Sequence, residues 1–190
     1  MKLIETLGVH TPISKEIEVF LKQNLTIRKY QKGTVLLDVG QVCGHIYFVE
    51  SGLARAYLAS DKGEDITTLL AESGDFIYSP ESFLTQMPSL ETIELLGQSE
   101  IVAIPLHILT QLYDNYPAAD RIGRLVTEKY ILMYNKRVNV MRSTLASVRI
   151  SQFMAQYPTI FEQTPNHHIA SYLGIARETL SRYMSGKHKN

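Results

Sequence analysis

The chain has 190 residues, 45% of them hydrophobic, which is enough for a packed core in one large domain or in a medium and a small one. Its formal net charge of zero excludes a strongly acidic or basic chain, and its single cysteine, Cys43, excludes a cysteine-held iron–sulfur cluster and an internal disulfide. Residues 1–18 do not read as a signal peptide, and no run approaches the ~18 apolar residues of a membrane span, so a cytoplasmic protein without membrane contact is expected.

Residues 14–24 are predicted to form a short amphipathic helix, because Ile17, Phe20 and Leu21 fall at helical spacing and Ser14 can cap the first turn. From about residue 25 to 105 the pattern changes to short apolar runs rich in β-branched and aromatic side chains, separated by Gly and Asp. Regular short strands with turn residues between them predict an antiparallel sandwich or barrel.

A long helix is predicted over residues 118–141, directly after Pro117. Val126, Met133 and Val140 recur every seven residues, and further apolar residues accompany them. One helix of this length cannot bury two apolar stripes against a small barrel, so we expect one stripe to pack on the barrel and the other on a second copy of the chain. A single wide core face in a monomer is the alternative.

Two further segments follow the long helix. Residues 142–144 look like a hinge, and residues 145–156 are predicted to form a helix that Tyr157-Pro158 ends. Residues 159–164 are interpreted as a connector.

Residues 164–186 carry the pattern that points most directly to a function. Thr164 is expected to cap a short helix, Gly174 to end it in the left-handed conformation, and a second helix to begin near Arg177. Ala170 is the small residue that two closely crossing helices require. This arrangement is typical of a helix-turn-helix, and an ordinary helical hairpin is the alternative.

The second helix would then be the recognition helix, which enters the major groove of DNA. Arginine can donate to guanine, glutamate can accept from cytosine, and hydroxyl groups can bond bases or phosphates. The candidates for base edges are Arg177, Glu178, Thr179, Ser181 and Arg182. The candidates for phosphates are His167, Lys187, His188 and Lys189. Plain solvation of a charged surface is the alternative for each charged residue.

The distribution of charge is consistent with this interpretation. Residues 1–141 hold 13 Lys and Arg against 17 Asp and Glu, whereas residues 142–190 hold 6 against 2. A basic segment after a mildly acidic one fits a phosphate-binding module attached to a regulatory one.

At this point the chain resembles the Crp/Fnr superfamily of bacterial regulators over nearly its whole length. KGTVLLDVG (32–40), IYFVESGLARAY (46–57) and GDF (74–76) look like the family's cyclic-nucleotide-binding-type β-roll. SVRISQFMAQYP (147–158) and IASYLGIARETLSRYM (169–184) resemble its DNA-binding domain.

The resemblance implies an α+β fold in three parts. Residues 1–116 would form an antiparallel β-roll of the double-stranded β-helix or jelly-roll type, and residues 117–141 a dimerisation helix. Residues 142–190 would form a helix-turn-helix domain that lacks a full C-terminal wing. The expected function is that of a sequence-specific transcription regulator that binds double-stranded DNA as a homodimer, with or without a small-molecule effector in the roll.

Two departures from the family pattern matter. Nucleotide-binding members hold the cyclic phosphate with an acidic residue after a turn glycine and with an arginine about ten residues further on. Here the turn is Gly74-Asp75, but SLETIELL (89–96) has no arginine, so cyclic AMP is not expected as a ligand. Ala176 replaces a capping Ser or Thr, which should cost the recognition helix roughly 0.5–2 kcal/mol.

An effector, if one exists, is expected between the roll and the long helix. The candidate residues are Gly74, Asp75, Phe76, Tyr78, Ser79, Thr92 and Arg124. No cofactor is identified, and no GxSxG, HExxH or GxxxxGK[ST] motif points to an enzyme. The alternative function is a small-molecule sensor that acts through a protein partner without binding DNA.

Overall fold

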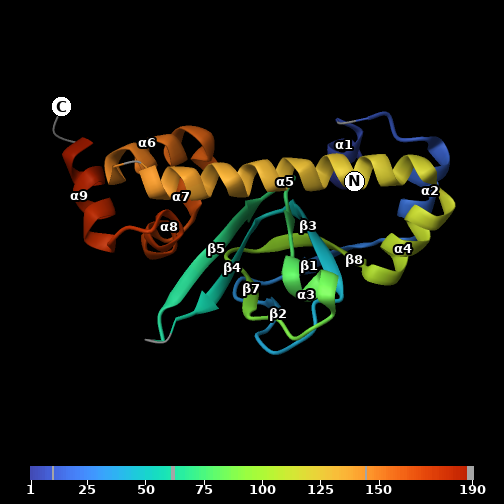
Figure 1. The fold of residues 1–190 in the computed structure, drawn as a ribbon, viewed down its shortest axis with the longest axis horizontal. Helices are drawn as coiled ribbons and strands as arrows, with labels where there is room; N and C mark the ends of the chain where they lie inside the picture. The colour runs from blue at the N-terminus through green and yellow to red at the C-terminus, as the bar shows by residue number, and fades with distance from the viewer. Residues whose placement is uncertain (10, 61–62, 144, 188–190) are drawn as a thin grey trace.

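The computed structural model describes residues 1–9, 11–60, 63–143 and 145–187 (Figure 1). Helices α1 (Lys2–Gly8) and α2 (Lys15–Asn24) come first. The Ser14 hydroxyl accepts a hydrogen bond from the Ile17 N–H at the start of α2, so the predicted helix and its cap are confirmed.

The strands of the described residues form two antiparallel sheets that enclose one core. One sheet has the order β1-β8-β3-β6 and the other the order β2-β7-β4-β5. The strands are β1 (Ile27–Tyr30), β2 (Val35–Leu37), β3 (His45–Ser51), β4 (Leu53–Ala59), β5 (Asp65–Glu72), β6 (Phe76–Ile77), β7 (Glu91–Leu95) and β8 (Ser99–Pro105), with helix α3 (Pro80–Thr85) between β6 and β7. The predicted antiparallel roll is therefore confirmed.

Apolar side chains fill the space between the two sheets. The buried core residues are Leu37, Cys43, Tyr47, Val49, Ala54, Ala56, Leu69, Ala71, Ile77, Phe83, Ile93, Leu95 and Ile101. Inside this core the Tyr47 hydroxyl donates a hydrogen bond to the Leu36 carbonyl at 2.7 Å, so this buried polar group is paired.

Helices α4 (Leu106–Asn115) and α5 (Pro117–Ser143) follow the roll. Helix α5 runs along the long axis of the molecule and passes across the roll (Figure 1). Ile122, Val126 and Tyr130 of α5 pack into the apolar cluster that also holds α1, α2 and α4. The predicted long helix is present and extends two residues beyond position 141.

A second face of α5 carries apolar side chains that no other described part of the chain covers, so they are exposed to solvent. Ile131 is 61% exposed and Val138 is 45% exposed, and Tyr134 lies half-buried between them in the sequence. Ile131 and Val138 fall at i and i+7, so they form one stripe along the helix, whereas burial raises the pKa of Tyr134 to about 12 near Glu91 and Tyr78. We call Ile131 and Val138 the α5 stripe.

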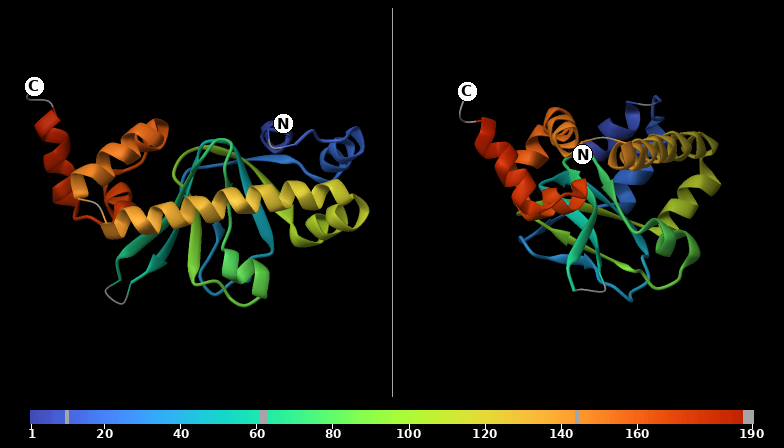
Figure 2. Two further views of the ribbon diagram at one scale, coloured as in Figure 1. Left: turned by 45° about the horizontal axis from the view of Figure 1, so that its top comes forward. Right: turned by 60° about the vertical axis from the view of Figure 1, so that its left-hand side comes forward.

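The C-terminal helices are α6 (Ala146–Gln156), α7 (Pro158–Gln163), α8 (Asn166–Leu173) and α9 (Arg177–Lys187). They gather at one end of α5, while α1, α2 and α4 lie at the other end (Figure 2). Their shared core contains Ile150, Ile169 and Leu180, and it also takes in Leu53 and Leu70 of the roll. The helical domain is therefore packed against strands β4 and β5.

Two sequence predictions near α7 are wrong. Residues 158–163 form a helix where a connector was expected, with Pro158 in its first turn. Thr164 ends α7 and does not cap α8, whose N-cap position is Pro165. Helices α1, α3 and α4 were not predicted from the sequence. The expected hinge includes Thr144, which lies outside the described residues.

None of the helices in the described part of the chain is long and apolar enough to span a membrane.

Candidate functional site

The turn between α8 and α9 has the geometry of a Schellman motif. Gly174 ends α8 in the left-handed region at φ 61° and ψ 43°. Its N–H donates to the Ser171 carbonyl at 3.1 Å, and the Ile175 N–H donates to the Ala170 carbonyl at 3.0 Å. These bonds satisfy carbonyls that the end of a helix would otherwise leave open, so the expected left-handed stop at Gly174 is confirmed.

Apolar packing fixes the angle between the two helices. Ile169 and Leu180 are fully buried, and Ala170 is 2% exposed. A Cβ at Gly174 would lie 2.9 Å from Met141 Cε, so the end of α5 also packs closely against this turn. The helix-turn-helix is therefore held to the long helix as well as within itself.

One side of α9 faces solvent and carries the predicted base-reading residues. Arg177, Glu178, Ser181 and Arg182 are exposed, and Thr179 is half-buried. The Arg182 Nε donates to the Glu178 carbonyl at 3.4 Å. Because Leu180 anchors the opposite side, the polar face is presented outward as a rigid surface.

The phosphate candidates lie at the ends of this unit. His167 is exposed in the first turn of α8, with its ring 3.8 Å from the ring of His168. Lys187 is the last residue of α9, and its side chain is not described. His188 and Lys189 lie outside the described residues.

Ala176, directly before α9, has no side-chain oxygen that could cap the first turn of the helix. The carbonyl of Ala176 accepts from the Thr179 and Leu180 N–H groups at 3.0 and 3.3 Å. Alanine offers no side-chain oxygen to the remaining donors, which leaves them available to an anion such as a DNA phosphate.

A buried arginine joins the roll to the helix-turn-helix domain. Arg55 of β4 is 4% exposed, and its Nη1 lies 2.7 Å from Nδ1 of His168. The same guanidinium forms ion pairs with Asp65 at 2.7 Å and with Glu94 at 2.5 Å. Burial and the neighbouring Arg55 cation lower the pKa of His168 to about 4, so His168 is neutral at pH 7.

Ser171 of α8 adds a second connection to the roll. Its hydroxyl accepts from the Thr67 N–H at 2.9 Å and donates to the Asp65 carbonyl at 3.0 Å. Helix α8 therefore completes hydrogen bonds along strand β5.

Arg137 connects α5 both to strand β5 of the roll and to helix α8. Its guanidinium donates to the carbonyls of Thr67 at 3.1 Å, of Tyr172 at 3.0 Å and of Thr68. It also stacks 4.1 Å from the centre of the Tyr172 ring. The long helix, the roll and the helix-turn-helix thus meet at one side chain.

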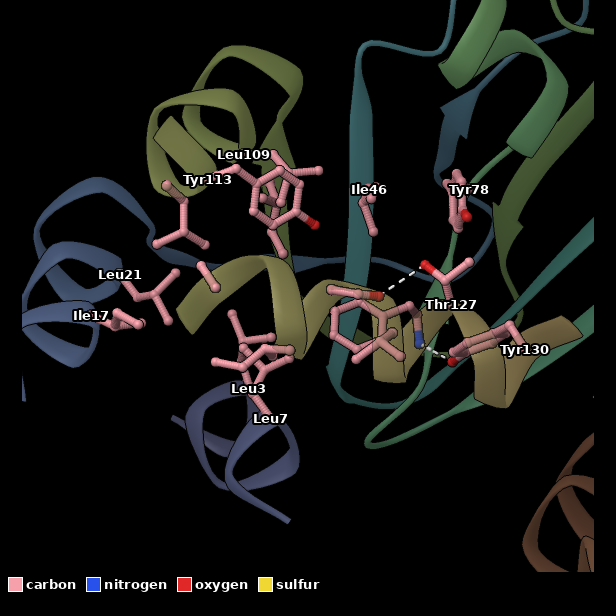
Figure 3. A pocket seen from close by; sticks show the side chains of 17 residues that line it. Leu3, Leu7, Ile17, Leu21, Ile46, Tyr78, Leu109, Tyr113, Thr127 and Tyr130 are labelled. Carbon is pink, nitrogen blue, oxygen red and sulfur yellow. Dashed lines mark hydrogen bonds between the residues drawn. The ribbon is translucent and has the colours of Figure 1, made fainter. Parts of the chain in front are cut away.

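Two of the effector candidates line an apolar cavity of about 100 Å³ between α1, α2, α4, α5 and the roll (Figure 3). Phe76 and Tyr78 form part of its wall, and the Tyr130 hydroxyl accepts from the Phe76 N–H at 2.7 Å. Gly123 lets helix α4 approach closely, because a Cβ there would lie 2.3 Å from the Tyr113 hydroxyl oxygen.

The other effector candidates lie elsewhere. Asp75 lines a different cavity, of about 230 Å³, and burial raises the pKa of its carboxyl group. Gly74 faces Lys2 and Thr6, and Ser79 is buried before α3. The Thr92 hydroxyl donates to Asp38, and Arg124 is exposed and paired with Glu128. The seven candidates therefore do not form a single site.

A cyclic nucleotide phosphate does not fit the residues present. The described residues that line the cavity of Figure 3 carry no cationic side chain. Arg55 is buried in the roll, but its guanidinium is already paired with Glu94 and Asp65. A buried phosphate would therefore lack the guanidinium partner that it requires.

Sequence reasoning did not find Arg55, Arg137, His168 or Ser171. A signal was present for Arg55, since it stands between Ala54 and Ala56 in an apolar strand and is nevertheless buried. A charged residue at such a position needs a buried partner.

The chain thus consists of an antiparallel β-roll that one long helix connects to a small domain containing a helix-turn-helix. The family model of the cyclic nucleotide-binding domain matches residues 27–116. The chain is 26% identical over 166 residues to the fumarate and nitrate reduction regulatory protein of Vibrio cholerae. The aligned segment covers 81% of this chain and 65% of that protein. The chain therefore spans just under two thirds of this relative's length.

Solved structures agree with this fold. The c-di-GMP responsive global regulator CLP of Xanthomonas campestris matches with a TM-score of 0.71 at 18% identity, covering 92% of each chain. FixK2 of Bradyrhizobium japonicum matches with a TM-score of 0.73 at 18% identity, covering 86% of this chain and 84% of that one. At 18% identity, these two structures show that the chain shares their fold of a β-roll, a long helix and C-terminal helices.

Proposed function

We propose that this protein is a sequence-specific DNA-binding transcription regulator that binds double-stranded DNA as a homodimer. The observation that carries the proposal is the exposed polar face of α9, held outward by the buried Leu180 and by the closely packed turn at Gly174. A short helix with this support can enter the major groove as a unit. The regulator names of its relatives favour this function over an enzymatic one.

The roles of the residues follow from their chemistry and position. Arg177 and Arg182 would donate to guanine, Glu178 would accept from cytosine, and Ser181 and Thr179 would add hydroxyl contacts. His167, Lys187 and Lys189 would contact phosphates, together with the open N–H groups at the start of α9.

The α5 stripe supports a homodimer. Ile131 and Val138 are large apolar side chains that water covers in the single chain, and a second α5 packed along them would remove both from water. A two-fold dimer would present two recognition helices to half-sites about one helical turn apart, roughly 34 Å.

In this proposal residues 1–116 are the sensor, residues 117–141 the dimerisation helix and residues 142–190 the DNA-binding domain. The contacts of Arg55, Ser171 and Arg137 carry changes in the roll to the recognition helix. Cyclic AMP is not proposed as the effector, because the cavity wall offers no cation to its phosphate. No metal or prosthetic group is proposed.

Selection from a pool of random DNA duplexes with the full chain tests this function. We expect enrichment of an inverted repeat whose half-sites are centred about 10 base pairs apart. A pool that enriches no sequence, while the folded protein captures DNA no better than a neutral protein of similar size, would contradict it. That result would favour the alternative of a sensor that acts through a protein partner.

A further inference from the structure

A second cavity, of about 320 Å³, lies between the C-terminal half of α5 and helices α6 and α8. It shares none of its lining residues with the cavity of Figure 3. Its wall combines four cations with aromatic rings, including Lys129, Lys136, Arg137, Arg149, Phe153 and Tyr157.

The cations in this wall have no acidic partner among the described lining residues. Among the described residues, the Arg137 guanidinium donates only to backbone carbonyls, and Arg149 donates from Nη1 to the Met141 carbonyl at 3.1 Å. The Lys136 Nζ reaches the Gln156 side-chain oxygen at 3.5 Å. These acceptors are neutral, so no carboxylate of the wall offsets the charge of the three groups, although Glu91, outside the wall, acts on Arg137.

Two N–H donors in the same wall have no acceptor at all. The Nε atoms of Arg137 and Arg149 are buried, and neither makes a hydrogen bond with the described residues. Buried donors in proteins are almost always paired, so these two unpaired groups add to the unmatched positive charge beside the cavity.

The shape of the wall restricts the kind of acceptor. Phe153, Tyr157 and Tyr172 add aromatic rings to the same wall, and Arg137 stacks on the ring of Tyr172. Asp75 lines the adjoining cavity together with Lys129, so an anionic group would avoid that end and lie toward Arg137 and Arg149.

We propose that this cavity binds a small organic anion, with a carboxylate or phosphate group at the two arginines and a flat apolar body against the aromatic rings. Such a molecule would contact α5 and the helix-turn-helix domain together and would favour their docked arrangement. The consequence for DNA rests on the proposed function, whereas the binding itself does not.

The site is also compatible with the proposed dimer. Leu132, which lines the cavity, follows Ile131 of the α5 stripe by one residue, and consecutive residues point about 100° apart around a helix. A second α5 on the stripe therefore leaves the mouth of the cavity on another side of the helix.

Isothermal titration calorimetry on the full chain without DNA tests the proposal. The probes are phenyl phosphate and benzoate, and phenol is the neutral match. We expect saturable binding of at least one anion and binding of phenol weaker by roughly tenfold, since one charge-assisted hydrogen bond is worth about that factor. Failure of both anions to bind, or equal binding of phenol, would overturn the proposal.

Variants locate the binding. Arg149→Gln should weaken the anion roughly tenfold, and Lys136→Gln, which removes an exposed side chain of the wall, should weaken it in the same direction. Arg121→Gln is the matched control, because Arg121 is exposed on the same helix and lies outside the wall. Circular dichroism verifies that each variant is folded. Unchanged affinity in both wall variants, or an equal loss in Arg121→Gln, would place the anion elsewhere.

Discussion

The guanidinium of Arg55 in strand β4 lies 2.7 Å from Nδ1 of His168 in helix α8, although 113 positions separate the two residues in the sequence. A guanidinium can only donate, so Nδ1 must accept and the His168 proton must reside on Nε2. The contact between the roll and the helix-turn-helix domain thus requires a neutral histidine.

This requirement predicts a pH dependence. An unfolded histidine has a pKa near 6.5, whereas that of His168 in the folded protein is about 4. Between these values the unfolded chain binds a proton that the folded chain does not, so stability should fall as the pH drops from about 6.5 toward 4. We expect the loss between pH 7 and pH 5 to be about 1–2 kcal/mol, measured as a shift in the urea midpoint.

His168→Asn supplies the control for this measurement. Asparagine keeps an acceptor close to the position of Nδ1 but does not titrate in this range. The variant should lose less stability than the wild type between pH 7 and pH 5. The same loss in both proteins would assign the pH dependence to other groups.

A side chain at position 174 should destabilise the turn between α8 and α9. Gly174→Ala places a Cβ in the left-handed region and 2.9 Å from Met141 Cε, so it should cost roughly 1–2 kcal/mol of stability. Gly186→Ala is the matched change, because Gly186 lies in α9 with open space around it. That change should stabilise the protein by roughly 0.5–1 kcal/mol. Urea unfolding of the two variants should therefore give shifts of opposite sign, and equal shifts would refute the assigned geometry.

The α5 stripe should control the oligomeric state. Ile131→Glu combined with Val138→Glu puts two like charges on each facing helix, so the wild-type dimer should become a monomer of 21.5 kDa in sedimentation equilibrium. Leu84→Glu is the control, because Leu84 is 77% exposed on α3 and should leave the dimer intact. A wild-type protein that sediments as a monomer at tens of micromolar would argue against the stripe as an interface.

Cys43 should be unreactive in the folded protein. Its side chain is fully buried, and burial raises the pKa of the thiol, which lowers the thiolate fraction at pH 8. Ellman's reagent should therefore modify Cys43 only after unfolding in urea. Rapid stoichiometric modification of the native chain would show that the thiol is open to solvent.

The parts of the fold that depend on local sequence were predictable. Ser14 and Gly174 act on neighbouring backbone groups, so the start of α2 and the end of α8 could be placed from residue type alone. Helix α7 escaped prediction because its six residues are too few to show a helical period, and tertiary packing of Ile160 holds it.

The candidate sites likewise divide into one that local sequence predicts and others that depend on distant segments. The exposed face of α9 follows from helical spacing around Leu180, and the structure agrees with it. The effector residues depended on distant segments coming together, and Thr92 and Arg124 instead bond to Asp38 and Glu128. The Arg55–His168 contact and the cationic cavity arise only from tertiary packing, so no local sequence pattern could predict them.

The most direct test of the account measures DNA affinity by fluorescence anisotropy on a selected duplex. Arg182→Ala should weaken specific binding by roughly 1–3 kcal/mol and relax the preference at one base position, whereas Arg121→Ala, on the opposite half of the molecule, should leave both unchanged. Equal affinity and equal site preference for Arg182→Ala and the wild type, together with the same result for Arg177→Ala, would contradict the assignment of α9 as the helix that reads DNA.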